Sequence, residues 1–254
     1  MKTIAIGNEK GGVGKTSTAG NLSYALMLQG YRVLMVDNDP QGSLTDWYHK
    51  EDLSFELADF FSSRDNLSNF ILPIRERLDL VPTAKGGDLR EYAETKLYRD
   101  RFAHLDLVKA AELLRYDFLI FDLNPNLSTL ERSAIAASNE ILLALEPEYF
   151  AYEGVHGFIK QLHRIREENR SDVILNKIVL SNKNESFRGH KYYTDQLSKQ
   201  DLTVYQIPQD RKVAECLEVS QSIHEYAPKS KAAAAYNTLA GGLVYGRKET
   251  VQSR

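Results

Sequence analysis

The chain has 254 residues, a formal net charge of −3 at pH 7 and a composition that is 43% hydrophobic and 26% charged. It has neither an apolar run near the ~20 residues of a membrane span nor the apolar core of a secretory signal, so we expect a cytoplasmic protein. The single cysteine, Cys216, excludes an internal disulfide and a four-cysteine cluster within one chain. We expect Cys216 to be a small buried apolar residue.

The charge is spread unevenly along the chain. Residues 1–185 hold 22 Lys+Arg against 28 Asp+Glu, whereas residues 186–254 hold 10 against 7, so the C-terminal part is the basic one. An excess this mild more often marks a solvated surface than a nucleic-acid site. The excess therefore indicates where DNA contacts would lie only if other features point to DNA.

Short apolar runs alternate with helical patterns from the N-terminus to residue 208. The runs are nearly continuous in hydrophobicity, which is typical of strands covered on both faces. They predict seven strands, at residues 2–8, 32–39, 77–83, 117–125, 140–147, 177–183 and 202–208. Helical patterns are clearest at residues 15–29 and 151–169, and residues 40–100 are the least regular part.

This alternation predicts an α/β fold, a doubly wound, mainly parallel β-sheet with helices on both faces. The sequence shows no repeat and no Pro/Gly/Ser-rich linker, so we expect a single domain over residues 1–254. Because the first predicted strand begins at residue 2, we expect no separate N-terminal DNA-reading domain. In such sheets ligands bind beyond the carboxyl ends of the strands.

Residues 8–18, NEKGGVGKTST, contain a phosphate-binding loop with an unusual start. The pattern G-x-x-x-x-G-K-[ST] requires glycine where this chain has Glu9. Glycines let backbone N–H groups turn toward phosphate oxygens, and the helix that follows presents its positive N-terminus to the same anion. The predicted nucleotide-binding residues are Gly11, Gly12, Val13, Gly14, Lys15, Thr16 and Ser17. Lys15 should contact the β- and γ-phosphates, and Thr16 should offer its hydroxyl to Mg²⁺.

A second lysine, Lys10, has no role in an ordinary phosphate loop. It lies five residues before Lys15, and two ammonium groups from one chain can hardly serve the same phosphates. Lys10 is therefore either a solvated lysine or a residue that points away from its own nucleotide and reaches the nucleotide of a second subunit.

Several motifs that follow one another along the chain indicate a resemblance to a known protein family. They are KGGVGKT at 10–16, VLMVDNDPQGSLT at 33–45, YDFLIFDLNP at 116–125, EPEYFAYEGV at 146–155 and the segment 207–236. Together they resemble the ParA/MinD class of deviant Walker A P-loop ATPases, closest to ParA-type DNA-partition ATPases, over nearly the whole chain. The chain departs from many relatives at Asn124, where they have proline, and in GSLT, which replaces the common GNAT.

The resemblance implies roles for three aspartates and for Lys10, with ATP and Mg²⁺ as cofactors. Asp39 would position or activate the attacking water, Asp37 would support the magnesium shell, and Asp122 would hold Mg²⁺ through water as the Walker B aspartate. Lys10 would cross a dimer interface to the nucleotide of the partner subunit. From the residues alone, two carboxylates two positions apart point to the same side of a strand, where a cation or a water network must occupy them.

The remaining candidate positions carry weaker signals. Asn182 and Pro208 lie at strand ends where adenine contacts are expected, but ordinary turn roles fit them equally. The six histidines form no metal-ligand spacing, and His156 and His163, seven apart, are better explained by helix packing.

The leading hypothesis is a ParA-type partition ATPase with weak turnover in the absence of its partner. It would form a homodimer when ATP is bound, bind DNA non-specifically on the nucleoid and be released when a ParB-type centromere-binding protein stimulates hydrolysis. Phosphate contacts add through counterion release, so two basic patches brought together would bind DNA even though the monomer is acidic. The candidate DNA contacts are Arg188, Lys191, Arg211, Lys212, Lys229 and Lys231.

Two other classes remain as alternatives. A MinD-like positioning ATPase would need an amphipathic membrane-targeting helix. The tail after residue 230 is instead rich in alanine and interrupted by Gly241 and Gly242, so we expect a docked helix and no stable membrane association. A metabolic or redox relative is the other class: a cluster-bearing reductase would need more cysteines, and a small-molecule ligase stays open.

Overall fold

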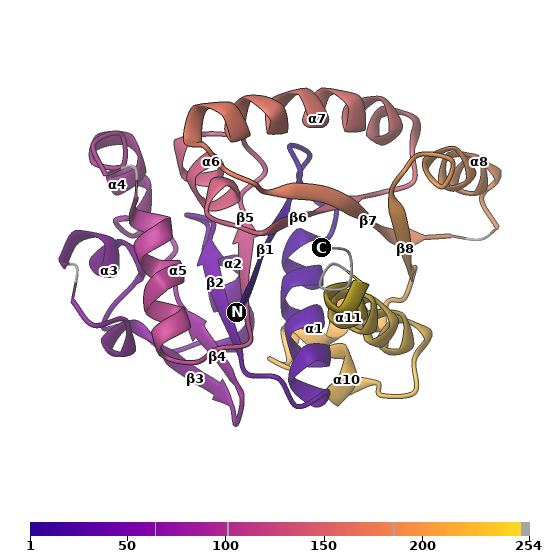
Figure 1. Ribbon diagram of the computed structural model, residues 1–254. Coiled ribbons are helices and arrows are strands. Elements are labelled where there is room, and N and C mark those ends of the chain that lie inside the picture. The colour runs from indigo at the N-terminus through magenta and orange to yellow at the C-terminus, as the bar shows by residue number, and fades with distance from the viewer. Residues whose placement is uncertain (64, 101, 185, 250–254) are drawn as a thin grey trace.

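The computed structural model describes residues 1–63, 65–100, 102–184 and 186–249, and its centre is an eight-stranded sheet (Figure 1). The strand order is β3-β4-β2-β5-β1-β6-β7-β8. Every neighbouring pair is parallel except β3 and β4. The strands are β1 Lys2–Gly7, β2 Val33–Asn38, β3 Leu72–Arg75, β4 Leu78–Val81, β5 Phe118–Leu123, β6 Glu140–Leu145, β7 Ile174–Lys183 and β8 Thr203–Pro208. The predicted fold class is therefore confirmed.

Each of the seven predicted strands is present, whereas β3 was missed within the irregular stretch 40–100. This strand has four residues, contains Pro73 and lies at the edge of the sheet, where a missing N–H is tolerated. Strand β7 begins three residues before its predicted start.

Helices cover both faces of the sheet (Figure 1). They are α1 Lys15–Leu28, α2 Ser43–Tyr48, α3 Leu57–Ser63, the 3₁₀ helix η1 Leu67–Phe70, α4 Leu89–Thr95, α5 Ala103–Leu113, α6 Thr129–Ala136, α7 Tyr149–Asn169, α8 Arg188–Leu197, α9 Lys212–Glu218, α10 Ile223–Tyr226 and α11 Lys231–Glu249. Helices α3, α5, α6 and α7 contribute to one core, and α1 and α11 to the other. Cys216 is buried in the second core, as expected.

The two cores explain the continuous hydrophobicity of the strands. In β5, Phe118 and Ile120 face the core of α1 and α11, whereas Leu119 and Phe121 face the core of α5 and α6. Successive side chains of a strand point to opposite faces, so a strand covered on both sides needs apolar residues at every position.

Helix α11 is docked against α1 and β8. Its buried side chains include Ala233, Tyr236, Leu239 and Leu243. A Cβ atom added to Gly242 would lie 1.7 Å from the hydroxyl oxygen of Tyr205 in β8, so this glycine allows the close approach. The expected docked helix is confirmed over the described residues, and none of the described helices is long and apolar enough to cross a membrane.

The two adjacent glycines of α11 give a matched pair of variants. Gly242→Ala should lower the free energy of unfolding by about 1–3 kcal/mol, because the new methyl group displaces the Tyr205 ring. A Cβ atom at Gly241 would have no neighbour within 4 Å, so Gly241→Ala should raise the free energy of unfolding by up to about 1 kcal/mol through the higher helix propensity of alanine. Urea unfolding of both variants measures the difference, and equal unfolding midpoints would contradict the docking of α11 on β8.

Candidate nucleotide-binding site

The loop between β1 and α1 is held in an open turn by glycines and by its neighbours. Gly12 and Gly14 have φ angles of 75° and 80°, in the left-handed region that favours glycine. The Asn8 side chain donates to the carbonyl of Ala144 in β6 at 2.7 Å and accepts from the Lys10 N–H at 3.1 Å. The Ser181 hydroxyl of β7 donates to the Val13 carbonyl at 2.5 Å. The loop is thus fixed to two strands before any ligand arrives.

Lys15, the first residue of α1, is 6% exposed. Its Nζ donates to the Lys10 carbonyl at 3.0 Å, so the ammonium group lies against the loop itself. Burial lowers the pKa of Lys15, while the charges of Asp122 and Asp39 act in the opposite direction. The first turn of α1 contains no acidic residue, so nothing on the helix offsets its positive N-terminus. This arrangement fits a polyphosphate.

Asp37 and Asp122 lie side by side, in register, on the neighbouring strands β2 and β5, and both are fully buried. Asp37 accepts hydrogen bonds from the Thr45 N–H and hydroxyl, both at 2.7 Å. Burial raises the pKa of Asp37 to about 7, against the effect of the Thr45 hydrogen bonds. Neither carboxylate oxygen of Asp122 has a hydrogen-bond partner within the described part of the chain. Burial raises the pKa of Asp122 well above its usual range, and the charge of Asp37 adds to the shift.

The chemistry of these side chains fits a magnesium ion held together with phosphates. Among the described residues no group of three or more His, Cys, Asp or Glu side chains is arranged to hold a metal ion. Mg²⁺ needs no such cage, since it usually binds through one or two carboxylates, a hydroxyl, water and the substrate phosphates. The buried, unpartnered carboxylate of Asp122 therefore supports Asp122 and Thr16 as its holders, while the oxygens of Asp37 are already engaged with the protein.

Asp39 lies just beyond β2, which ends at Asn38. It is 8% exposed and accepts a hydrogen bond from the Gln41 N–H at 2.9 Å. Burial raises the pKa of Asp39, against the effects of the Gln41 hydrogen bond and the charges of Lys15 and Arg90. A carboxylate with one oxygen held by the backbone keeps acceptor sites for a water molecule.

Lys10 occupies a different environment from Lys15. Its side chain is 47% exposed, and its Nζ lies 3.0 Å from Glu148 Oε2 and 3.4 Å from Glu146 Oε2. The hydrogen bond with Glu148 raises the pKa of Lys10 more than burial lowers it. Lys10 is therefore a half-exposed, permanently charged group at the outer edge of the loop, paired with carboxylates of its own chain.

A cavity of about 360 Å³ adjoins the phosphate loop. Its lining includes Gly12, Gly14 and Ser17 of the loop together with Asn182 and Pro208, the two candidate adenine contacts. Its remaining lining is Glu146, Ser181, Ile207, Asp210, Val213, Ala214, Leu217 and Tyr236. A mainly apolar cavity with a few polar groups at its edge is suited to a planar base.

Comparisons with known proteins agree with this geometry. A family model described as "AAA domain" (AAA_31) matches residues 1–175. The sporulation initiation inhibitor protein Soj of Bacillus subtilis is 30% identical over 254 residues, which cover 94% of this chain and 96% of that protein. The chromosome-partitioning ATPase Soj of Thermus thermophilus is 30% identical over 256 residues, covering 94% of each chain. The chain belongs to the ParA/MinD family of P-loop ATPases.

Its fold is also similar to that of a solved structure with bound nucleotide. The cobyrinic acid a,c-diamide synthase from Mycobacterium smegmatis, solved with bound ADP and magnesium, superposes with a TM-score of 0.81 at 25% identity. The match covers 98% of this chain and 96% of that one. The fold is thus shared over nearly the full length of both proteins.

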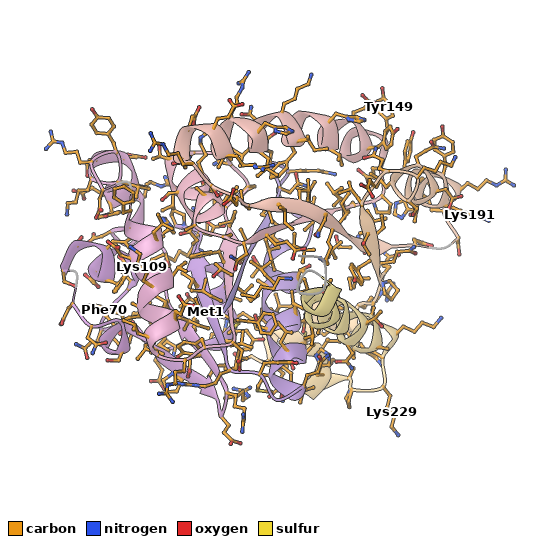
Figure 2. All side chains as sticks on the ribbon, viewed as in Figure 1. Met1, Phe70, Lys109, Tyr149, Lys191 and Lys229 are labelled. Carbon is orange, nitrogen blue, oxygen red and sulfur yellow. The ribbon has the colours of Figure 1, made fainter. Side chains whose placement is uncertain are left out.

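The candidate DNA contacts of this ParA/MinD protein lie on or next to α8, α9 and α11. Lys191 and Lys229 are labelled on the right-hand side of Figure 2, on α8 and just before α11. All six candidates are exposed, and within the described ranges none has an ion pair: Arg188, Lys191, Arg211, Lys212, Lys229 and Lys231.

Sequence reasoning missed the side chains that hold the predicted ones. Glu146 and Glu148 belong to the motif EPEYFAYEGV, but nothing in that motif indicates that they pair with Lys10. Asn8, Ser181 and Thr45 are small polar residues without a spacing signal. Only their position at the carboxyl ends of strands, or in the short helix α2 that follows β2, could have indicated them.

The contrast between Asp122 and Asp37 yields a test. Without nucleotide and Mg²⁺ at pH 8, Asp122→Asn should raise the free energy of unfolding by about 1–3 kcal/mol, because it removes a buried carboxylate that has no partner. The same change should weaken magnesium-dependent nucleotide binding. Asp37→Asn is the control and should not stabilise, because an amide N–H₂ would replace an oxygen that accepts hydrogen bonds. Urea unfolding decides, and equal stabilisation of both variants would contradict the assignment.

Proposed function

We propose that this chain is a ParA-type ATPase for DNA partition, acting as a single domain over residues 1–254 in the cytoplasm on the nucleoid. ATP with Mg²⁺ drives formation of a dimer that binds DNA without sequence preference. Hydrolysis stimulated by a ParB-type centromere-binding partner then releases it. The observation that carries the proposal is the position of Lys10, half exposed at the outer edge of the loop whose phosphate contacts belong to Lys15. The name of the Thermus thermophilus relative, a chromosome-partitioning ATPase, supports DNA as the surface on which this protein acts.

Each predicted site residue has a task in this proposal. Thr16 and Asp122, supported by Asp37, hold Mg²⁺, which supplies positive charge at the phosphates. Lys15 and the loop N–H groups bind the phosphates, and Asp39 orients the attacking water. Lys10 brings a cation to the nucleotide of the partner subunit, where it offsets the charge that develops during phosphoryl transfer.

The acidic net charge of the chain is compatible with DNA binding. Each basic group placed on a phosphate releases counterions, and these contributions add. One subunit offers a small set of exposed and unpaired cations, whereas a dimer offers two sets at once. DNA binding that depends on ATP follows from this doubling without any change within the subunit.

Two alternatives make different demands. A MinD-like positioning ATPase acting on a membrane needs a free amphipathic segment, but the apolar residues of α11 are buried against α1 and β8 over the described residues. A ligase such as the one named for the Mycobacterium smegmatis structure would turn over ATP only with its acid substrate and a nitrogen donor. Hydrolysis with DNA and no such substrate separates a partition ATPase from a ligase.

Two variants in the loop and the water site test the nucleotide-gated dimer. We expect DNA binding at fixed low salt with ATP but not with ADP, and a doubling of mass under the same conditions. Lys10→Ala should lose both the dimer and DNA binding, because it removes the cross-subunit cation. Asp39→Ala should retain both and lose hydrolysis. Light scattering and DNA filter binding measure these effects, and an ATP-dependent dimer that ignores DNA would reject the partition proposal.

The basic residues of α8 test where DNA lies. Arg188→Ala and Lys191→Ala should each weaken DNA binding for all sequences and reduce the slope of log K against log salt by about 1 for each phosphate that is no longer neutralised. Lys109→Ala is the matched control, since Lys109 is 72% exposed but lies on α5 and pairs with Asp106. An equal effect of Lys109→Ala would show that the binding follows net charge and not this surface.

A further inference from the structure

Two fully buried polar side chains and one that is partly buried join α5 and α6 to the end of β2. The Nε2 atom of His104 lies 2.8 Å from Asn38 Oδ1, and its Nδ1 atom lies 2.9 Å from Ser133 Oγ. His104 and Asn38 are both fully buried. Asn38 is the last residue of β2 and stands between Asp37 and Asp39.

The surroundings define the direction of these hydrogen bonds. The His104 ring packs against Phe61 and Phe121, with ring centroids 4.8 and 5.6 Å away. Burial lowers the pKa of His104 to about 3, so the ring is neutral and carries one N–H. With Oδ1 of Asn38 turned to the ring, as placed here, Nε2 carries the proton and donates to it, and Nδ1 accepts from the Ser133 hydroxyl. Both ring nitrogens are thus engaged.

The end of β2 is held from both faces of the sheet. On one face the Asp37 carboxylate accepts from Thr45, and the Thr83 hydroxyl donates to the Asp37 carbonyl. On the other face His104 holds Asn38. Across the part of the chain that the structure describes, the hydrogen bonds of Asp39 itself run within the segment 37–42, so its place depends on how the two preceding residues are held.

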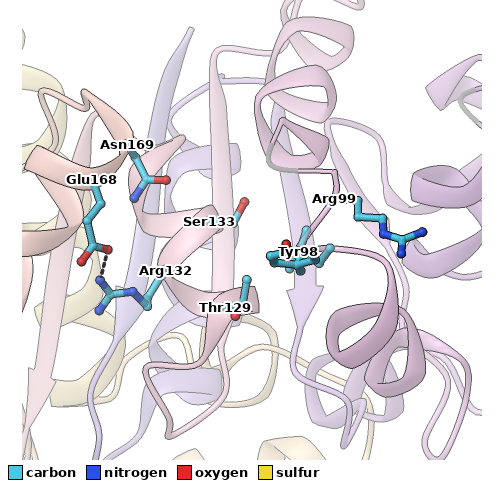
Figure 3. A pocket seen from close by; sticks show the side chains of 8 residues that line it. Tyr98, Arg99, Thr129, Arg132, Ser133, Glu168 and Asn169 are labelled. Carbon is cyan, nitrogen blue, oxygen red and sulfur yellow. Dashed lines mark hydrogen bonds and ion pairs between the residues drawn. The ribbon is translucent and has the colours of Figure 1, made fainter.

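Ser133 belongs to α6, the helix that comes next in the chain after Asp122, the candidate magnesium-binding residue. Helix α6 follows the loop after Asp122, and a capping box between Ser128 and Glu131 fixes its first turn. Ser133 also lines a cleft of about 710 Å³ between α6, the end of α7 and residues 97–99 (Figure 3). The space on that side of α6 leaves room for the helix to shift.

We propose that Asn38, His104 and Ser133 form a positioning network that sets Asp39 relative to the nucleotide and couples it to α6, the helix that follows the Asp122 loop. This proposal rests on the proposed ATPase function. None of the three residues needs to touch the nucleotide. They act through the backbone at the end of β2, and a displacement of α6 would reach Asp39 through two hydrogen bonds.

A structural role and a positioning role predict different results for a double replacement. His104→Leu alone leaves the buried amide of Asn38 without its partner and should destabilise the fold. The pair Asn38→Leu with His104→Leu leaves only the Ser133 hydroxyl without its partner. Ser133 lines a cleft where water can replace that partner, so the double variant should regain much of the unfolding midpoint. If the network positions Asp39, the hydrolysis rate stays low in this double variant although the fold has recovered.

The experiment measures urea unfolding, affinity for a fluorescent ADP analogue and single-turnover hydrolysis of MgATP with DNA present. We expect His104→Leu and the double variant to lower the rate about 10-fold or more, with the affinity for the analogue unchanged. His104→Gln, which keeps a donor and an acceptor, should restore most of the rate. His224→Leu is the matched control, because His224 is also buried and bonded to Asn237 but lies in the core of α1 and α11. It should lose stability and keep its rate.

The outcomes are distinguishable. A double variant with the wild-type rate, or a His224→Leu variant slowed as much as His104→Leu, overturns the positioning network and leaves the ATPase proposal intact. A wild-type protein that binds MgATP but leaves it unhydrolysed in a single-turnover assay long enough to detect even the weak turnover expected without the partner overturns the proposed function, and the network with it.

Discussion

The site depends on how the chain accommodates like charges at the carboxyl ends of β2 and β5. Asp37 and Asp122 are opposite each other on these neighbouring strands, fully buried, where two carboxylates repel and neither is solvated. The two carboxylates are stabilised in different ways. Thr45 satisfies Asp37, whereas no hydrogen bond of good geometry reaches Asp122 among the described residues, and the nearby Thr16 hydroxyl and Lys15 charge offset only part of the effect of burial and of Asp37 on its pKa. The site is therefore prepared for a further cation before a nucleotide binds.

The same constraint separates the two lysines of the loop. Lys15 is buried next to this negative charge, and its burial makes it part of the fold as well as of the site. Lys10 pairs with the half-exposed Glu148 and the less exposed Glu146. Ion pairs near the surface contribute at most about 1 kcal/mol, so Lys10 can exchange partners at little cost. Glu146 connects the two regions, since it pairs with Lys10, accepts from Asn182 and lines the cavity beside the phosphate loop.

The sequence predicted the parts of the fold and site that depend on local pattern. Strands covered on both faces give continuous apolar runs, and a glycine-rich turn between a strand and a helix gives the phosphate loop. Strand β3 could not be predicted, because a short edge strand with Pro73 and partly exposed residues has no such pattern. The pairing of His104 with Asn38 also could not be predicted, because it joins residues 66 positions apart whose side chains meet only after α5 packs on the sheet. The sequence predicted that Lys10 lies at the outer edge of the loop, but it could not predict its ion-pair partners. Glu146 and Glu148 follow β6, more than 130 positions further along the chain.

Buried polar atoms without hydrogen-bond partners are concentrated next to the candidate nucleotide site. Elsewhere the strands alternate apolar side chains between two cores, and buried polar groups are as a rule hydrogen-bonded. Within the described residues, six buried side-chain atoms lack a partner, and three of them belong to Asn38 and Asp122. A chain selected for stability alone would fill these positions with apolar residues, as it does at Val36 and Phe121 on the same strands. Unpaired groups concentrated at adjacent strand ends are the pattern expected where stability is given up for a ligand.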